Sequence, residues 1–341
     1  MRIRAIATSL ASLVAASACG FHSGGLLPNA ASYGAAQFRA QKAPLATHFL
    51  EYRVPTPGSQ PYDVAFAPNG SLWLTEQNTN KVARMTRSGS FAEFRAPNAG
   101  SMPTGIALAG GYVWFAENQY NVVVRATATG HMKSYRIPGG ENIEPNEVAG
   151  GPDGRVWLSL DYGNAIAAIA PSTGATSVYK LPHFNSHPQH ITVGPDGNLW
   201  FTEEVGNRIG RITTAGKIAE FAIPTIGSQP AGIATGPDKN LWFAESQGNK
   251  IGRLTPSGRF TEFRIKLGLD SEPMAIVSGQ KNMLWFTEFS GNAVSSITTS
   301  GVVTRYPVPT ANSQPNGLVS DPMGWLWFTE FNGNKVGRFT P

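Results

Sequence analysis

The sequence is poor in cysteine and in charged residues, and both shortages narrow the class of protein. Cys19 is the only cysteine in 341 residues, which excludes an intramolecular disulfide framework and a zinc site built on paired cysteines. Charged residues make up only 14% of the chain. Basic residues give a net charge of +5, but they are spread along the chain rather than gathered in a stripe, so we expect no nucleic-acid partner.

The chain also lacks long apolar runs beyond its start. After residue 18, no segment reaches the roughly 18 continuous apolar residues that cross a bilayer. Residues 1–18 have the parts of an export signal: early arginines, an apolar stretch and the small residues Ala16-Ser-Ala18. Cys19 follows directly, as in a bacterial lipoprotein signal, although Ala16-Ser-Ala18 also suits ordinary signal peptidase.

Residues 19–47 are rich in Gly, Ala and Ser without periodicity, which predicts a flexible tether. We therefore expect an exported protein of the periplasm or cell envelope. A lipid on Cys19 would be its only link to a membrane.

What the sequence has instead is a repeat of about 42 residues. A tryptophan recurs at Trp73, Trp114, Trp157, Trp200, Trp242, Trp285 and Trp327. A proline upstream keeps the same spacing at Pro61, Pro103, Pro145, Pro188, Pro230, Pro273 and Pro315. Seven units of this length, each with several short strands, indicate a β-propeller or a solenoid.

Each unit predicts four short strands, and the chain ends predict a closed ring. In the fifth unit the strands are expected over 231–235, 240–245, 249–254 and 259–264, with turn residues between them. The seventh unit stops after its third strand, while residues 48–55 form an unmatched fourth strand near the start. We therefore predict an all-β fold over 48–341: a seven-bladed β-propeller of four-stranded blades, closed by the N-terminal strand. Closure leaves only short, protected sheet edges.

The repeated segments resemble a known family. Leu199-Trp-Phe-Thr-Glu203 and Gly206-Asn-Arg-Ile-Gly-Arg-Ile-Thr213 are similar to repeats of the virginiamycin B lyase (streptogramin lyase) family, and the resemblance covers 48–341. Members of that family bind Mg²⁺ and open cyclic depsipeptide antibiotics by elimination: a base removes a proton beside a carbonyl, and the ester carboxylate departs. The resemblance therefore implies a histidine base and a metal held by carboxylates.

The positions that the resemblance marks as catalytic hold other residues here. The family has histidines directly after the repeat proline in blades six and seven, and a glutamate directly before it in blade seven. Those positions are Met274, Asn316 and Gln314. Tyr62 does match the tyrosine that follows the family's first repeat proline. Methionine cannot take a proton, and the amides replace neither a base nor a charged ligand, so the family's site is largely absent.

A different group of polar residues predicts a site at the mouth of the central channel. Three of the six histidines lie within residues 183–190, which lead into the inner strand of blade four. Two positions after the repeat proline, where other blades have glycine or alanine, blades one, three and four have Asp63, Glu147 and His190. Acidic groups beside an imidazole can orient it, raise its pKa or share a metal with it.

We hypothesise a site with a defined set of members. They are Tyr62, Asp63, Glu144, Asn146, Glu147, His187 and His190, with Glu272, Gln314 and Asn316 as further ligand-binding candidates. The alternative is that these residues only hydrogen-bond loops around a water-filled channel.

Other repeated polar positions are expected to be structural. Six units end their second strand with a glutamate, namely Glu76, Glu117, Glu203, Glu245, Glu288 and Glu330, and an arginine recurs in the third strand. The repeated tryptophans are expected in the core, because each lies between apolar neighbours. The eighth tryptophan, Trp325, is expected to be exposed.

Two functions are consistent with these observations. One is a monomeric, non-catalytic binding propeller that presents the channel mouth to a small molecule, peptide, glycan or partner protein. The other is an Mg²⁺-dependent carbon–oxygen lyase that opens a cyclic depsipeptide or lactone. In the lyase His190 would be the base, Glu147 its partner or a metal ligand, and Tyr62 a further catalytic residue.

Overall fold

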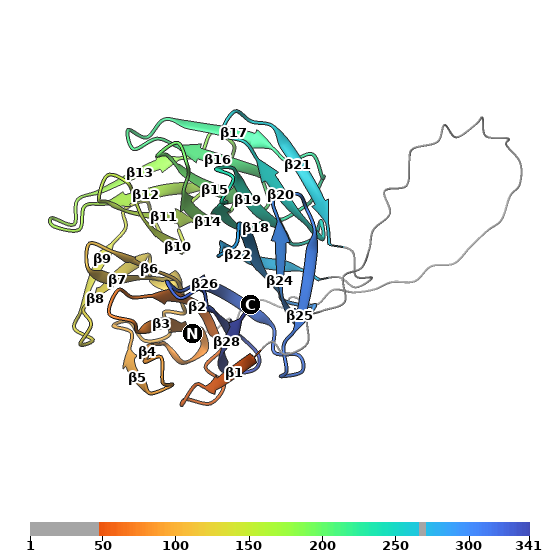
Figure 1. The fold of residues 1–341 in the computed structure, drawn as a ribbon. Helices are drawn as coiled ribbons and strands as arrows, with labels where there is room; N and C mark the ends of the chain where they lie inside the picture. The colour runs from red at the N-terminus through yellow and green to blue at the C-terminus, as the bar shows by residue number, and fades with distance from the viewer. Residues whose placement is uncertain (1–47, 266–270) are drawn as a thin grey trace, which may run out of the picture. The chain divides into compact units, whose positions relative to one another are not determined.

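The structure, a computed structural model, describes residues 48–265 and 271–341. It contains 28 strands in seven four-stranded antiparallel sheets, which are arranged as blades around a ring (Figure 1). The predicted seven-bladed, all-β propeller is therefore confirmed. The export signal, the tether and the lipidation of Cys19 lie outside the described residues. None of the helices within the described ranges is long and apolar enough to cross a bilayer.

The strands follow one another from the inside of each blade to the outside. Blade one has β2 (Pro61–Phe66), β3 (Leu72–Glu76), β4 (Lys81–Met85) and β5 (Phe91–Arg95). Blade two has β6 (Pro103–Ala109), β7 (Tyr112–Glu117), β8 (Val122–Ala126) and β9 (Met132–Arg136). Blade three has β10 (Pro145–Gly150), β11 (Val156–Leu160), β12 (Ala165–Ile169) and β13 (Thr176–Lys180). Blade four has β14 (Pro188–Val193), β15 (Leu199–Glu203), β16 (Arg208–Ile212) and β17 (Ile218–Ala222).

The remaining blades repeat this order. Blade five has β18 (Pro230–Thr235), β19 (Leu241–Glu245), β20 (Lys250–Leu254) and β21 (Phe260–Arg264). Blade six has β22 (Pro273–Ser278), β23 (Met283–Glu288), β24 (Ala293–Thr298) and β25 (Val303–Pro307). Blade seven has β26 (Pro315–Ser320), β27 (Leu326–Glu330), β28 (Lys335–Thr340) and, from the start of the chain, β1 (His48–Arg53). Two short 3-10 helices, η1 (Gln77–Thr79) and η2 (Asn118–Tyr120), follow β3 and β7.

The first strand closes the ring, as predicted. β1 pairs antiparallel with β28, from His48 opposite Thr340 to Arg53 opposite Lys335. The Lys335 ammonium also lies 2.7 Å from a carboxyl oxygen of Glu51 on β1. The innermost strands contact their neighbours around the whole circle, and β26 contacts β2 across the junction. Figure 1 shows the first strand and the last strand side by side in one blade.

The repeated tryptophans form the core between blades. All seven are at most 1% exposed. Trp200 stacks on Phe221 of its own blade, with 5.5 Å between ring centroids. Trp157 packs with Ile191 and Phe201 of the next blade. Burying a large apolar side chain stabilises the fold by roughly 2 to 3 kcal/mol, so the seven positions account for much of the cohesion between neighbouring blades.

An asparagine in the turn between the second and third strands ties each blade to the next. Each of these asparagines has a positive φ, between 47° and 57°, a conformation that asparagine tolerates better than most residues. In blade one, Oδ1 of Asn80 accepts hydrogen bonds from the backbone N and hydroxyl of Ser101 at 2.7 and 2.6 Å. At the junction, Asn334 of blade seven bonds Ser59 before blade one in the same way, at 2.7 and 2.8 Å.

A second repeated feature shapes the end of the ring where the innermost strands begin. The residue before each repeat proline has a positive φ of 46° to 54°; these residues are Gln60, Met102, Glu144, His187, Gln229, Glu272 and Gln314. Its carbonyl accepts a hydrogen bond from the first residue after the second strand, as Glu144 does from Asp161 at 2.9 Å. This hydrogen bond holds the turn after the second strand beside the loop that precedes the repeat proline.

We call this end of the ring the mouth. In each blade it comprises four residues: the one before the repeat proline, the two after it, and the first one after the second strand.

Candidate functional site

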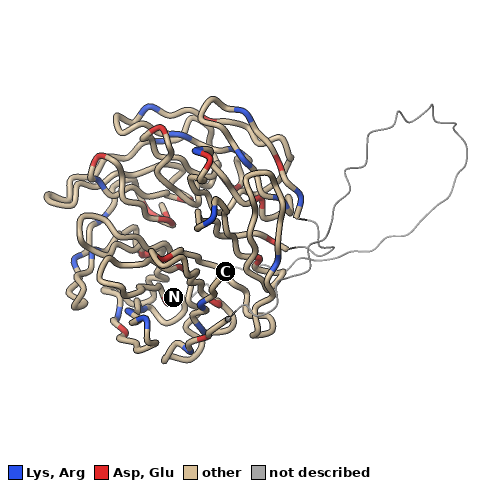
Figure 2. Tube along the Cα trace, in the orientation of Figure 1, with Lys and Arg blue, Asp and Glu red and all other residues tan. Residues whose placement is uncertain are grey.

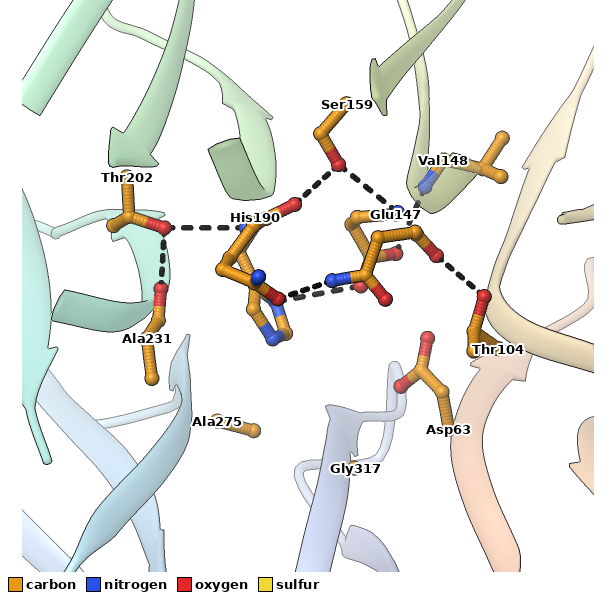
Figure 3. Close-up of polar contacts among 12 residues, drawn as sticks. Asp63, Thr104, Glu147, Val148, Ser159, His190, Thr202, Ala231, Ala275 and Gly317 are labelled. Carbon is orange, nitrogen blue, oxygen red and sulfur yellow. Dashed lines mark hydrogen bonds and ion pairs between the residues drawn. The ribbon is translucent and has the colours of Figure 1, made fainter. Parts of the chain in front are cut away.

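Glu147 and His190 lie side by side at the mouth. They occupy the same position of adjacent innermost strands, β10 and β14, which contact each other. Nδ1 of His190 is 3.4 Å from Oε2 of Glu147. Hydroxyl groups fix both backbones: Glu147 N donates to Ser159 Oγ at 3.0 Å, and His190 N donates to Thr202 Oγ1 at 3.1 Å. Figure 3 shows this arrangement, with Asp63 across from the pair.

Small residues elsewhere on the ring make room for these side chains. A Cβ at Gly105 would lie 2.7 Å from Oε1 of Glu147, and one at Gly317 would lie 2.7 Å from Oδ1 of Asp63. Distances this short are steric clashes. The backbone of the neighbouring blade is equally close, as it also is at Gly232 beside Ala275, so glycine at these positions reflects the close approach of the innermost strands.

Burial controls the charge of this inner group. It raises the pKa of Asp63 to about 6. Burial also raises the pKa of Glu147 well above its ordinary value, with the charge of Asp63 adding to the effect. The same burial lowers the pKa of His190 to about 4. At neutral pH the imidazole is therefore uncharged and can accept a proton, while Glu147 holds its proton more tightly than an exposed glutamate does.

A second polar group lies on the loops and turns of blades three and four. Nδ1 of His187 is 2.7 Å from Oδ1 of Asp161, and the Tyr162 ring meets the His187 ring edge-on at 4.9 Å. Burial raises the pKa values of Asp161, Glu144 and Glu204, and the charge of Asp161 raises the last two further.

Asp161 and Glu204 were not among the predicted site residues. Each is the first residue after a second strand, a position at which the repeat has no consensus. In the structure this position is marked by its backbone hydrogen bond to the residue before the repeat proline. The sequence alone does not reveal that bond.

Two further predicted residues join these groups. Asn146 donates a hydrogen bond from Nδ2 to Oε1 of Gln189, and so connects blades three and four. Tyr62 lies near the carboxylates of the inner group and of the second group. Burial raises the pKa of its hydroxyl, and the charges of Glu147, Asp63, Glu204 and Asp161 raise that pKa further, in this order. Tyr62, Asp63, Glu144, Asn146, Glu147, His187 and His190 are thus brought together at one part of the mouth.

The residues at the family's catalytic positions make structural contacts. Met274 packs against an apolar cluster between blades five and six. Asn316 is 7% exposed, and its Nδ2 donates to the Tyr62 carbonyl at 2.9 Å. Glu272 accepts a hydrogen bond from the hydroxyl of Ser290. The roles of Glu272, Gln314 and Asn316 in ligand binding stay predictions.

The Met274 thioether is not a ligand of the kind that Mg²⁺ prefers, and Asn316, whose amide nitrogen is engaged, offers only a neutral oxygen. Among residues 48–265 and 271–341, no three His, Cys, Asp or Glu side chains are placed to hold a metal ion. Two of the positions that the resemblance marks thus hold no charged ligand, and a bound Mg²⁺ stays a prediction.

The repeated glutamates pair with the repeat prolines and so adjoin the mouth, but their side chains are buried. The six glutamates are at most 1% exposed, and the guanidinium of Arg253 lies over the ring of Trp242 at 5.4 Å. Trp325, predicted to be exposed, is instead half-buried, because Arg338 covers its ring at 4.2 Å. A hollow of about 190 Å³ adjoins Trp325 between blades six and seven, but it contains none of the predicted site residues.

Comparison with known proteins places the chain. The sequence pattern of the virginiamycin B lyase family matches residues 39–143 and 139–341. A streptogramin B lyase structure is 32% identical, with a TM-score of 0.84, and the match covers 88% of this chain and 99% of that one. A catalytically inactive virginiamycin B lyase variant from Staphylococcus aureus, solved with quinupristin, is 36% identical, with a TM-score of 0.83, over 87% of this chain and 100% of that one.

The virginiamycin B lyase of Bacillus licheniformis is 46% identical over 39 residues, which are 11% of this chain and 13% of that protein. That segment is about as long as one repeat, whereas the structures match over most of this chain. With its seven blades, its closing strand and a family match over more than half of its length, the chain belongs to the virginiamycin B lyase family.

Proposed function

We propose that this protein is a ligand-binding propeller that holds a small molecule, peptide or glycan at the mouth. The observation that carries the proposal is a difference between blades in which mouth residues are structural and which are polar. At the positions where the family has its histidines, Met274 and Asn316 support the fold. Blades one, three and four instead add charged and polar side chains at the mouth, and Glu147 and His190 lie side by side among them.

This inner pair suits hydrogen bonding to a ligand. The neutral His190 imidazole offers both a donor and an acceptor. Glu147 and Asp63, with raised pKa values, can donate or accept, depending on their protonation. Because the surroundings are largely buried, each hydrogen bond made there is stronger than in bulk water.

The second candidate function is a carbon–oxygen lyase, which one feature of the pair favours. The neutral imidazole of His190 could remove a proton beside a carbonyl of a cyclic depsipeptide or lactone. The electrons of that C–H bond would form a C=C bond, while the ester C–O bond breaks and the carboxylate leaves. Glu147 would orient the imidazole and, in its carboxylate form, stabilise it once protonated.

One experiment separates the two functions. The purified protein is incubated with a cyclic streptogramin B and Mg²⁺, with and without a chelator, and the products are analysed by chromatography and mass spectrometry. Elimination opens the ring without changing the mass, whereas hydrolysis adds one water. We expect the substrate to remain intact. A ring-opened product of unchanged mass that is lost in His190→Ala would establish the lyase instead.

Ligand binding itself is tested by screening a set of charged and neutral small molecules and peptides by ligand-observed NMR. We expect binders that are lost in the double variant His190→Ala/Glu147→Gln. His131→Ala is the matched control, because His131 is an exposed histidine on a turn outside the mouth. Binders that persist in the double variant would contradict a site at the mouth.

We also propose that the protein is exported to the periplasm or cell envelope. The proposal is supported by the sequence of residues 1–19 alone. Fractionation of a bacterium that expresses the full chain tests it, since a cytoplasmic protein would stay with the cytoplasmic fraction.

A further inference from the structure

A polar hollow lies in blade one, at the end of the ring opposite the mouth. Residues 69–71 and 86–88, which lie in the turns after β2 and β4, line it together with Arg84 on β4, and its volume is about 510 Å³. Sites for small molecules commonly have volumes of about 300 to 1,000 Å³. We call this site the blade-one hollow. Two of the described residues that line it are arginines and none is acidic. Figure 2 shows Lys or Arg in this blade, where Figure 1 labels β4 and β5.

Arg84 lacks the carboxylate partner that the same arginine has in other blades. In blade four the third-strand arginine, Arg211, lies 3.7 Å from Asp196 in the turn before the second strand, and blade five repeats this ion pair. Blade one has Asn69 at the place of the aspartate. An amide has no charge, so the exchange leaves the positive charge of Arg84 without its usual partner.

No aromatic ring takes the place of the missing aspartate. In blades two and seven the third-strand arginines, Arg125 and Arg338, each lie over an aromatic ring at 4.2 Å. Within the described part of the chain, Arg84 makes neither an ion pair nor a ring contact, and its one hydrogen bond runs from Nη1 to the Ala128 carbonyl at 2.6 Å. Most N–H donors of this guanidinium are therefore available to a ligand.

Arg87 adds a second positive charge at a turn position that is uncharged in other blades. The corresponding residues of blades two, four, five and six are Ala128, Thr214, Pro256 and Thr299. Nη2 of Arg87 lies 3.8 Å from Oδ2 of Asp321 in blade seven, which is too far for a hydrogen bond. Nε of Arg87 is buried and has no hydrogen-bond partner among the residues that the structure describes. Asp321 thus offsets part of the charge of Arg87 but does not satisfy its donors.

Hydroxyl groups contribute further donors to the blade-one hollow. Thr86 Oγ1 and Ser88 Oγ lie 2.8 Å apart and share one hydrogen bond. Because only one of the two hydroxyls donates to the other, the second keeps its proton for a ligand. The same pair recurs in blade five as Thr255 and Ser257, so the two guanidiniums are what distinguishes blade one.

We propose that the blade-one hollow binds the phosphate group of a small phosphate monoester, such as a sugar phosphate. Arg84 and Arg87 would donate hydrogen bonds to the phosphate oxygens, because the planar guanidinium fork matches the geometry of phosphate. A phosphate monoester has a charge of about −2 near neutral pH, which two guanidiniums balance better than they balance a single negative charge. The hollow is larger than a phosphate group, so the sugar would lie beside the hydroxyls of Thr86 and Ser88. This site is separate from the mouth, and the inference goes beyond the proposed function.

Isothermal titration of the full chain with three matched sugars tests the proposal. Glucose 6-phosphate carries a phosphate, glucuronate carries a carboxylate on a similar ring, and glucose is neutral. We expect glucose 6-phosphate to bind at least tenfold more tightly than the other two, and more weakly as salt is raised, because salt screens charge pairs. In Arg84→Gln/Arg87→Gln, its binding should fall at least tenfold. Arg136→Gln, which removes an exposed arginine from β9, should bind it like the parent.

Asn69→Asp tests the same site without removing any side chain from it. The variant restores the aspartate that blade four has as Asp196, so the new carboxylate should pair with Arg84 and repel the phosphate. We expect glucose 6-phosphate binding to fall at least tenfold while the midpoint of urea unfolding stays at the parent's value. A loss of binding with an unchanged midpoint is caused by charge in the hollow and not by unfolding.

Several outcomes would overturn the proposal. They are no detectable binding of glucose 6-phosphate, equal binding of glucose or glucuronate, and unchanged binding in Arg84→Gln/Arg87→Gln or in Asn69→Asp. The mouth is tested separately, because glucose 6-phosphate should bind His190→Ala/Glu147→Gln like the parent. A compound that still binds this mouth variant but is lost in Arg84→Gln/Arg87→Gln occupies the blade-one hollow, so failure at one site leaves the other standing.

Discussion

The buried glutamate that ends β19 provides a sharp test of the electrostatics. Glu245 is fully buried, and no donor is aligned to bond either of its carboxyl oxygens within the described residues. Burial raises its pKa from about 4.5 to about 7. Glu262 adds to this rise, while Lys250 and the Thr225 hydroxyl oppose it.

The sign of the effect follows from the folded pKa lying above the unfolded one. Between pH 4.5 and 7 the folded protein binds more protons than the unfolded chain, so the free energy of unfolding falls as pH rises through this window. Each pKa unit is worth about 1.4 kcal/mol, so the ionised form is penalised by roughly 3 kcal/mol. Glu245→Gln mimics the protonated side chain. We therefore expect it to raise the free energy of unfolding by about 2 to 3 kcal/mol at pH 8, and by less than about 1 kcal/mol at pH 5.

Urea unfolding of parent and variant at both pH values measures this difference. Asp196→Asn is the control of opposite sign: although burial opposes it, hydrogen bonds from Trp200 and Asn198 lower the pKa of Asp196. That variant should lose stability at pH 8. If Glu245→Gln shifts the free energy of unfolding equally at pH 5 and pH 8, the carboxyl is not protonated in the folded protein and the reasoning is refuted.

Three further predictions concern closure, crowding and anchoring. Asn334→Ala removes the acceptor of both Ser59 hydrogen bonds and two donated bonds, and should lower the free energy of unfolding by roughly 2 to 4 kcal/mol. Asn332→Ala, in the same turn but exposed, should change it by under about 0.5 kcal/mol; equal losses would contradict the tie between blades. Gly317→Ala places a methyl against Asp63 and should lower the thermal midpoint, while Ala275→Gly at the same position of blade six should have a smaller effect; the reverse order would rule out crowding. Cys19→Ser should move the protein from the membrane fraction to the soluble fraction; unchanged fractionation would show that Cys19 carries no anchor.

The fold could be predicted from the sequence because each blade repeats the same physical solution. The strands expected in the fifth unit agree with β18 to β21 within one residue, since turn residues bound each apolar run. The closing strand was also predictable, because residues 48–55 match an outer strand that the last unit lacks. Each short strand alone could be assigned in more than one way. The pattern occurs seven times, and comparing the seven copies removes this ambiguity.

The site was less predictable, because its residues break the repeat. Glu147 and His190 stood out as charged or polar exceptions at a position otherwise small, and adjacent blades place them together. Asp161 and Glu204 occupy a variable turn position, so no deviation marked them. Their proximity to His187 depends on a backbone bond to a residue with positive φ, which cannot be read from side-chain chemistry. Trp325 is half-buried rather than exposed as the sequence had predicted, because the guanidinium of Arg338 covers its ring.

The pairing of β1 with β28 has a consequence for how the chain reaches its final structure. β1 and β28, the first and last strands of the described residues, belong to one sheet although almost 300 residues separate them. β1 has no partner until β28 is available to pair with it. A chain that stops before β28 would therefore leave an unpaired strand edge exposed, and quality-control proteases could recognise it. Because β1 pairs with β28, the ring can close only once β28 has been made.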